Sequence, residues 1–208
     1  MSTNTAEAIP ARHGGYRFIP GVSQYSGGVG ALPGYALERV RFSRPVPLNA
    51  GFERVAAIIK AAGQPLTAFC ACELRSPKPF TEQGFRDFNT VYTAVLSSWG
   101  IVVDGVNPVA RSNVCPKVEP PAEPSFHAFT YVVPAPDAPP SFMISGSAES
   151  QEGPGDYRSR IVRLDDTSPE GLREKAIAVL NEMERRMSAF SGNWPQTTGV
   201  QIYTVHDI

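Results

Sequence analysis

Prolines are spread unevenly along this sequence, and their clustering constrains its fold more than any other feature. Eight of the 20 prolines fall between residues 116 and 140, on either side of a strand-like run at 126–133. Proline has no backbone N–H and a fixed φ, so it ends helices and is excluded from central strands. We therefore predict a loop over residues 116–124 and a linker over residues 134–140.

The linker divides the 208 residues into a complete unit, residues 1–133, and a smaller unit, residues 141–208. The smaller unit has too few elements to bury a core of its own, because small chains hide a smaller fraction of their surface. We therefore expect it to pack on the first unit or on a neighbouring subunit.

Two segments of the first unit have the apolar spacing of an amphipathic helix. The first spans residues 49–62, with Asn49 as its expected N-cap and Gly63 at its end. The second begins near Thr81 and is closed by Gly100. Strands are predicted for the remaining apolar runs of this unit, at residues 37–42, 66–74, 110–115 and 126–133.

The smaller unit contains one strong helix signal, in which Ser168 is followed by Pro169 and Glu170. The predicted helix runs over residues 168–191. Strands are expected at residues 142–145, 159–164 and 200–205. The order of elements matches part of the first unit, which favours a duplication with a truncated second copy.

Charge and hydropathy exclude several classes of protein. The 19 basic and 20 acidic side chains give a net charge of -1, which is not typical of a dedicated nucleic-acid binder. No apolar run approaches the roughly 18 residues of a membrane span. Residues 1–12 have no apolar stretch of the kind found in signal peptides. We expect a cytoplasmic protein with neither a nucleic-acid nor a membrane partner.

The cysteines and histidines do not indicate a metal centre. Three cysteines, Cys70, Cys72 and Cys115, accompany three scattered histidines, whereas zinc requires about four converging ligands. Buried packing is the ordinary role of such cysteines. The sequence also lacks phosphate-binding and dinucleotide-binding motifs. We therefore expect no metal and no cofactor.

Four short motifs of the first unit follow one another in a recognisable order. Residues 87–92 (DFNTVY) resemble a D-F-x-x-V-N helix, and residues 108–114 (PVARSNV) resemble a P-A-R-S-x-V strand. Residues 24–29 (QYSGGV) are similar to a P-Y-S-Q-x-V segment, and residues 61–63 to an E-A-A-G turn. These are motifs of the Rid family, the YjgF-like imine and enamine deaminases. Residues 142–146 (FMISG) resemble that family's I-x-S-G-Q strand, in the partial second copy.

The resemblance implies an α+β fold of the chorismate-mutase-like, ferredoxin-like kind. A mixed sheet would carry helices on one face, in one complete copy followed by a partial one. Family members are usually trimers with ligand clefts between subunits. Self-association, as a trimer, is therefore expected here, although the extra half-copy would replace part of a neighbour's surface.

Arg111 is the first candidate for the functional site. The guanidinium group is always charged and matches the planar geometry of a carboxylate. In the family that Arg111 resembles, the arginine of this strand binds the substrate carboxylate, which implies the same role here. Tyr25 and Ser26 correspond to a segment at the family's cleft, where Tyr25 would orient the reacting group and Ser26 would contact substrate.

Three further candidates mark departures from the family pattern. His127 stands where family enzymes carry a water-activating glutamate, and it is either a general base or an ordinary hydrogen-bonded histidine. Arg44 adds a cation where the family has small polar groups. Cys115, four residues after Arg111, would share a strand face with it, either lining the cleft or packing in the core.

The resemblance favours a hydrolase that acts on an imine or enamine of a carboxylate-bearing small molecule and releases ammonia. The absent glutamate indicates a substrate other than 2-iminopropionate, such as an aminomuconate or another unsaturated acid. Two alternatives stay open. One is a non-catalytic protein that binds a small carboxylate. The other is a chorismate-type enzyme, which would use two cations such as Arg111 and Arg44.

Overall fold

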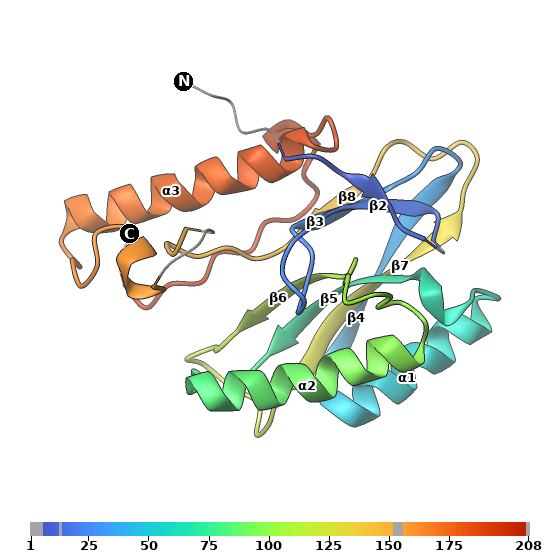
Figure 1. The fold of residues 1–208 in the computed structure, drawn as a ribbon, viewed down its shortest axis with the longest axis horizontal. Coiled ribbons are helices and arrows are strands. Elements are labelled where there is room, and N and C mark those ends of the chain that lie inside the picture. Colours follow the sequence, from blue (N-terminus) through green and yellow to red (C-terminus); the bar gives the residue numbers. More distant parts are fainter. Residues whose placement is uncertain (1–5, 13, 152–155, 207–208) are drawn as a thin grey trace. The chain divides into compact units, whose positions relative to one another are not determined.

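The computed structural model describes residues 6–12, 14–151 and 156–206, and these form two units (Figure 1). The larger unit is Glu7–Ser145, and the smaller unit begins at Gly146 and includes Ala6. The boundary therefore falls after Ser145, whereas the prolines predict it at residues 134–140. The reason is that residues 142–144 form a strand that pairs within the larger unit.

The larger unit contains two four-stranded sheets. The first is antiparallel, in the order β1-β2-β3-β8, and its strands are β1 (Ile9–Pro10), β2 (Tyr16–Ile19), β3 (Gly28–Ala31) and β8 (Phe142–Ile144). The second has the order β4-β7-β5-β6, and its strands are β4 (Tyr35–Pro47), β7 (Ser125–Pro134), β5 (Phe69–Arg75) and β6 (Ala110–Val114). Only the β5–β6 pair is parallel. The α+β class is thereby confirmed.

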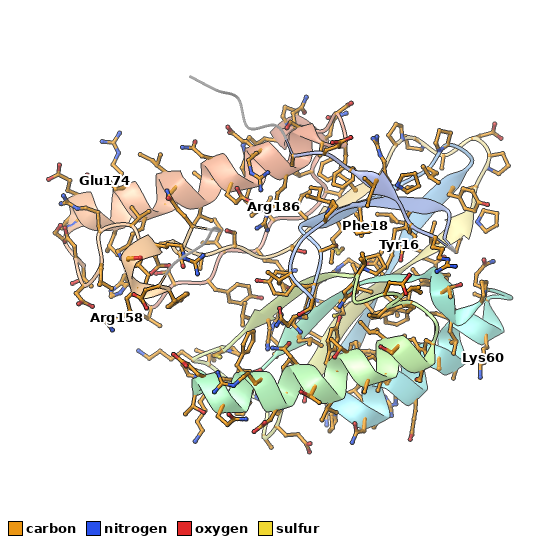
Figure 2. All side chains as sticks on the ribbon, viewed as in Figure 1. Tyr16, Phe18, Lys60, Arg158, Glu174 and Arg186 are labelled. Carbon is orange, nitrogen blue, oxygen red and sulfur yellow. The ribbon has the colours of Figure 1, made fainter. Side chains whose placement is uncertain are left out.

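Two helices, α1 (Leu48–Ala61) and α2 (Glu82–Ser98), cover one face of the second sheet (Figure 1). The Phe52 ring of α1 packs edge-on against Phe126 of β7, with centroids 5.0 Å apart. Gly51 lies so close to the same ring that any side chain there would clash with it. Buried rings of β2, including Tyr16 and Phe18, complete the core (Figure 2).

The ends of these helices test the predicted boundaries. Helix α2 begins near Thr81 as predicted, and Thr81 caps it by accepting a hydrogen bond from the Gly84 N–H. Gly63 and Gly100 have the positive φ that ends a helix. The prediction that Asn49 caps α1 is wrong. The helix begins one residue earlier, because the Leu48 N–H donates to the Pro124 carbonyl and needs no side-chain cap.

The smaller unit is built on helix α3 (Pro169–Ser188), which begins as predicted with Ser168 as N-cap and Pro169 as its first residue. Two short 3₁₀ helices, η2 (Arg158–Arg160) and η3 (Trp194–Gln196), flank it, and a third, η1 (Leu66–Ala68), precedes β5. The strands predicted at 159–164 and 200–205 are wrong. Their alternating apolar pattern finds no partner strand among the unit's described residues, which contain only one isolated bridge, between Ser150 and Ile161.

Candidate functional site

Arg111 lies in β6, at one edge of the second sheet, directly opposite Cys72 of the parallel strand β5. Only 5% of its surface is exposed. Its side chain is directed at α2, the helix that covers this end of the sheet. Burial of a permanent charge is unfavourable unless neighbouring groups compensate it. The residues around the guanidinium therefore indicate whether Arg111 is paired within the protein.

Four aromatic rings surround the Arg111 guanidinium. Its Cζ atom lies 4.8 Å from the ring centroid of Tyr92 and 5.0 Å from that of Tyr25. Phe88 and Phe85 follow at 5.6 and 5.9 Å. All four are within the roughly 6 Å over which a cation is attracted to the face of an aromatic ring. The rings stabilise the positive charge but leave it unneutralised.

One polar side chain contacts the guanidinium directly. Arg111 Nη1 donates a hydrogen bond to Asn89 Oδ1 at 2.7 Å, and Asn89 is itself 95% buried. The Asn89 amide nitrogen donates to the Phe85 carbonyl, also at 2.7 Å. No aspartate or glutamate of the described residues is paired with Arg111. The guanidinium is therefore buried, positively charged and partnered by a neutral amide.

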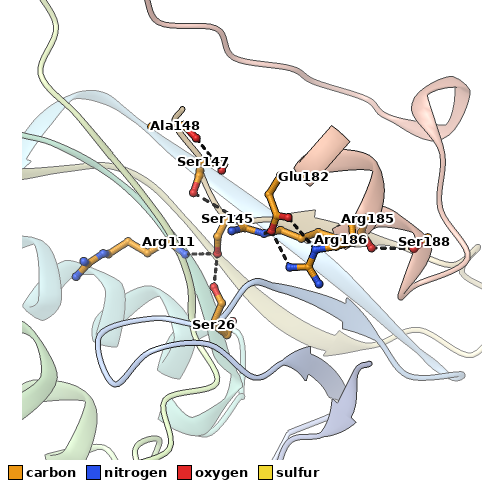
Figure 3. Close-up of polar contacts among 10 residues, drawn as sticks. Ser26, Arg111, Ser145, Ser147, Ala148, Glu182, Arg185, Arg186 and Ser188 are labelled. Atoms are coloured by element: carbon orange, nitrogen blue, oxygen red, sulfur yellow. Dashed lines mark hydrogen bonds and ion pairs between the residues drawn. The ribbon is translucent and has the colours of Figure 1, made fainter. Parts of the chain in front are cut away.

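The backbone of Arg111 is held by a serine at the end of the larger unit (Figure 3). The Arg111 N–H donates to Ser145 Oγ at 3.0 Å, and the Ser145 hydroxyl donates to the Ser26 carbonyl. The Ser26 N–H in turn donates to the Val109 carbonyl. These bonds join β6 of the second sheet to segments that border β3 and β8 of the first sheet, and they place Tyr25 beside Arg111.

One of these rings also contacts a cysteine, because Cys72 Sγ lies 3.4 Å from the Tyr92 hydroxyl. Burial raises the pKa of Cys72 to about 12, and burial also raises the pKa of Tyr92. Both groups stay protonated near neutral pH. Cys72 is therefore a packing residue that anchors the Tyr92 ring, and it does not act as a thiolate nucleophile.

The structure brings three of the candidate residues together, namely Arg111, Tyr25 and Ser26, the last through its backbone. Arg44 is exposed on β4, and strands β7 and β5 separate β4 from β6. Cys115 follows the end of β6 and is exposed, and desolvation raises the pKa of its thiol. Within the larger unit, Arg44 and Arg111 do not form the paired cations of a chorismate-type site.

His127 lies on the other face of the sheet from Arg111. Cys72 and Arg111 are opposite each other and both face α2, so Glu73, the next residue of β5, faces away from it. His127 lies near a β-bulge among the charges of that second face. Desolvation lowers its pKa, and so does the nearby Arg75, against the effect of Glu73. Glu73 itself forms a two-point ion pair with Arg39, at 2.6 and 3.0 Å.

Other features of the described residues do not compete with this site. A surface hollow of about 320 Å³ lies between α1 and α2, away from Arg111, and is lined by Asn49, Phe52, Glu53, Ala56, Val95 and Trp99. No group of three or more histidine, cysteine, aspartate or glutamate side chains is placed to hold a metal ion in the part of the chain described. No helix in that part is both long and apolar enough to cross a membrane.

The sequence does not single out Asn89, Phe85, Phe88 or Tyr92 as part of this site, because their apolar spacing is that of any amphipathic helix. These four positions share one face of α2, because they are spaced three and four residues apart. An asparagine in an otherwise aromatic stripe was the available signal. In the motif of residues 87–92, Tyr92 also stands where the Rid pattern has asparagine, and Asn89 lies one turn earlier on the same face.

Comparison with known proteins identifies a family that matches most of the chain. Residues 8–208 match the family model of the 2-aminomuconate deaminase CnbZ. The chain belongs to this family, within the Rid, YjgF-like deaminases. It is also 50% identical over 204 residues to a 2-amino-5-chloromuconate deaminase of Comamonas testosteroni, covering 97% of this chain and 81% of the relative. No solved structure matches the chain.

Proposed function

We propose that this protein is a deaminase of 2-aminomuconate-type dicarboxylates, in which Arg111 binds one substrate carboxylate. The family match and the 50% identical relative support the reaction. The observation that carries the binding role is the buried guanidinium of Arg111, which is partnered by aromatic rings and a neutral amide. A bound carboxylate would supply the negative charge that no described residue provides to Arg111.

The proposed chemistry needs only water as a second reactant. A proton moves to a carbon of the enamine, so that the C–N bond of the substrate becomes a C=N bond. Water then adds to the carbon of the C=N bond, and a proton passes from the added water to the nitrogen. The resulting C–N single bond breaks, and ammonia leaves. The product is the corresponding 2-oxo acid. Since the protonated imine is already electrophilic, positioning of substrate and water contributes most of what the protein must provide.

Tyr25 is the proposed orienting group. Its ring lies over Arg111, and its hydroxyl has no hydrogen-bond partner among the described residues, so that it is free to contact the substrate amine. A hydroxyl is useful here because the substrate amine, once buried, loses its hydrogen bonds to water and requires a partner in the protein. Ser26 would contribute through its backbone contacts, and Cys115 and Arg44 have no proposed part within one chain.

His127 remains a proposed general base only in a self-associated form. It faces away from Arg111, so it would reach a substrate bound at Arg111 from a second copy of the chain. Desolvation keeps its imidazole neutral and able to accept a proton. We propose the trimer, and the chorismate-mutase-like arrangement with a partial second copy, on the Rid resemblance alone. Light scattering coupled to size-exclusion chromatography measures the oligomer directly.

The test of the proposed function is ammonia release from enzymatically generated 2-aminomuconate. Wild-type protein should accelerate it, and Arg111→Met should lower kcat/KM by about 100-fold, because a two-point charged contact is worth about 3 kcal/mol. Arg54→Met removes an exposed arginine of α1 and is the matched control, with kcat/KM close to wild type. Equal turnover by wild type and Arg111→Met would refute the binding role, and no turnover by wild type would refute the deaminase.

A further inference from the structure

We infer that Asn89 is a positioning residue whose neutrality keeps Arg111 available to an anionic ligand. This inference rests on the proposed function, since it concerns how Arg111 takes the substrate carboxylate. It concerns a position at which the family's helix motif specifies no residue.

The orientation of the Asn89 amide is set from both ends. Its nitrogen donates to the Phe85 carbonyl one turn earlier in α2, and this leaves its oxygen directed at Arg111 Nη1. Both contacts are 2.7 Å long, and Asn89 is buried. The amide therefore fixes one corner of the guanidinium in a defined direction.

The remaining donors of Arg111 are uncommitted. A guanidinium has five N–H donors, and one is used by Asn89. The four neighbouring rings interact with the charge through their faces and accept no conventional hydrogen bond. The other guanidinium donors have no partner among the described residues. Arg111 is thus oriented by one neutral contact, and its charge and most of its donors are left for a ligand.

Aspartate has almost the shape of asparagine but carries a negative charge. Asn89→Asp would convert the contact into a buried ion pair and place a permanent competitor beside the ligand carboxylate. The same change would relieve the cost of burying an unpaired cation, but it would lose the hydrogen bond that the Asn89 amide donates to the Phe85 carbonyl. Asn89→Asp should therefore weaken substrate binding more than Asn89→Ala, which loses both contacts, but lower thermal stability less. A purely structural asparagine predicts the same order for both quantities, with Asn89→Ala the more affected variant in each.

The experiment compares Asn89→Asp, Asn89→Ala and wild type in the full chain. Three quantities are measured: KM and kcat with 2-aminomuconate, Kd for the unreactive analogue cis,cis-muconate, and Tm. Asn89→Asp should raise KM and Kd at least 10-fold, with a Tm above that of Asn89→Ala. Asn89→Ala should lower Tm and raise KM and Kd less. Asn49→Asp, which adds the same charge at an exposed helix position, is the control and should leave KM and Kd unchanged.

The outcomes separate this inference from the proposed function. If Asn89→Asp binds cis,cis-muconate as tightly as wild type, or if Asn89→Ala is the more affected variant in both Tm and affinity, the inference is overturned while the deaminase stands. If wild type neither binds the analogue nor releases ammonia, the proposed function fails and this role of Asn89 fails with it. Weaker binding by Asn89→Asp than by Asn89→Ala, together with a higher Tm, supports the inference.

Discussion

Arg186 in the smaller unit and Arg111 in the larger unit are both buried, with 1% and 5% of their surface exposed, but they differ in their partners. Arg186 Nε lies 2.6 Å from Glu182 Oε1, one turn earlier in α3, and its Nη1 donates to the Gly146 carbonyl (Figure 3). Within the described residues Arg111 has a neutral amide instead. Arg186 therefore has the surroundings of a structural arginine, whereas those of Arg111 support the ligand-binding role proposed for it.

The largest loss of stability is expected for Arg186→Met, at the arginine that has a carboxylate partner. Loss of a buried partner of Glu182 should lower the free energy of unfolding by about 2 kcal/mol, less than for a fully isolated pair because Arg185 also binds that carboxylate. Urea denaturation measures this change. Arg185→Met, at the more exposed partner, should cost less. A loss of stability for Arg111→Met as large as for Arg186→Met would remove the distinction between the two arginines.

A smaller loss of stability is expected when an aromatic ring beside Arg111 is changed. Tyr92→Phe keeps the ring over Arg111 and removes only the contact with Cys72, so stability should fall by less than about 1 kcal/mol. Tyr92→Leu removes the cation–π contact as well, and about 1–2 kcal/mol should be lost. The two variants are compared by thermal unfolding. Equal losses would mean that the contact between the Tyr92 ring and the charge of Arg111 contributes nothing to stability.

The smallest effect concerns pH and the opposite face of the sheet. Because the pKa of His127 is lowered in the folded protein, the unfolded chain binds a proton more readily. Its contribution to stability is present above the unfolded value of about 6.5 and is lost as pH falls through the folded value. His127→Gln should therefore flatten this part of the stability curve between pH 7.5 and 5, measured by urea unfolding. An unchanged curve would show that folding does not lower the pKa of His127.

The sequence predicts those features that local chemistry determines. Helix α2 begins beside Thr81, Ser168 caps α3, and Gly63 and Gly100 end their helices, because each of these features depends on a few neighbouring residues. The role proposed for Arg111 rests on the resemblance of its strand to a family motif. In these cases the deciding contacts lie within one turn or one motif.

Features that depend on distant contacts were not predictable in this way. The face on which His127 lies depends on a β-bulge, and an extra residue reverses the side that a simple alternation assigns. The pattern at residues 200–205 is that of a strand, but a strand needs a partner, and none is present in its unit as described. Asn89 contacts Arg111 only when α2 is packed against β6, so the sequence of α2 alone does not indicate this contact.

The bond between Ser145 and Ser26 joins residues 119 positions apart in the chain. Closing so long a loop is slow relative to forming α1 or α2, whose contacts are local. The surroundings of Arg111 are therefore completed late in folding, after synthesis has passed residue 145. A carboxylate bound at Arg111 would hold this last-formed closure in place and slow its reopening.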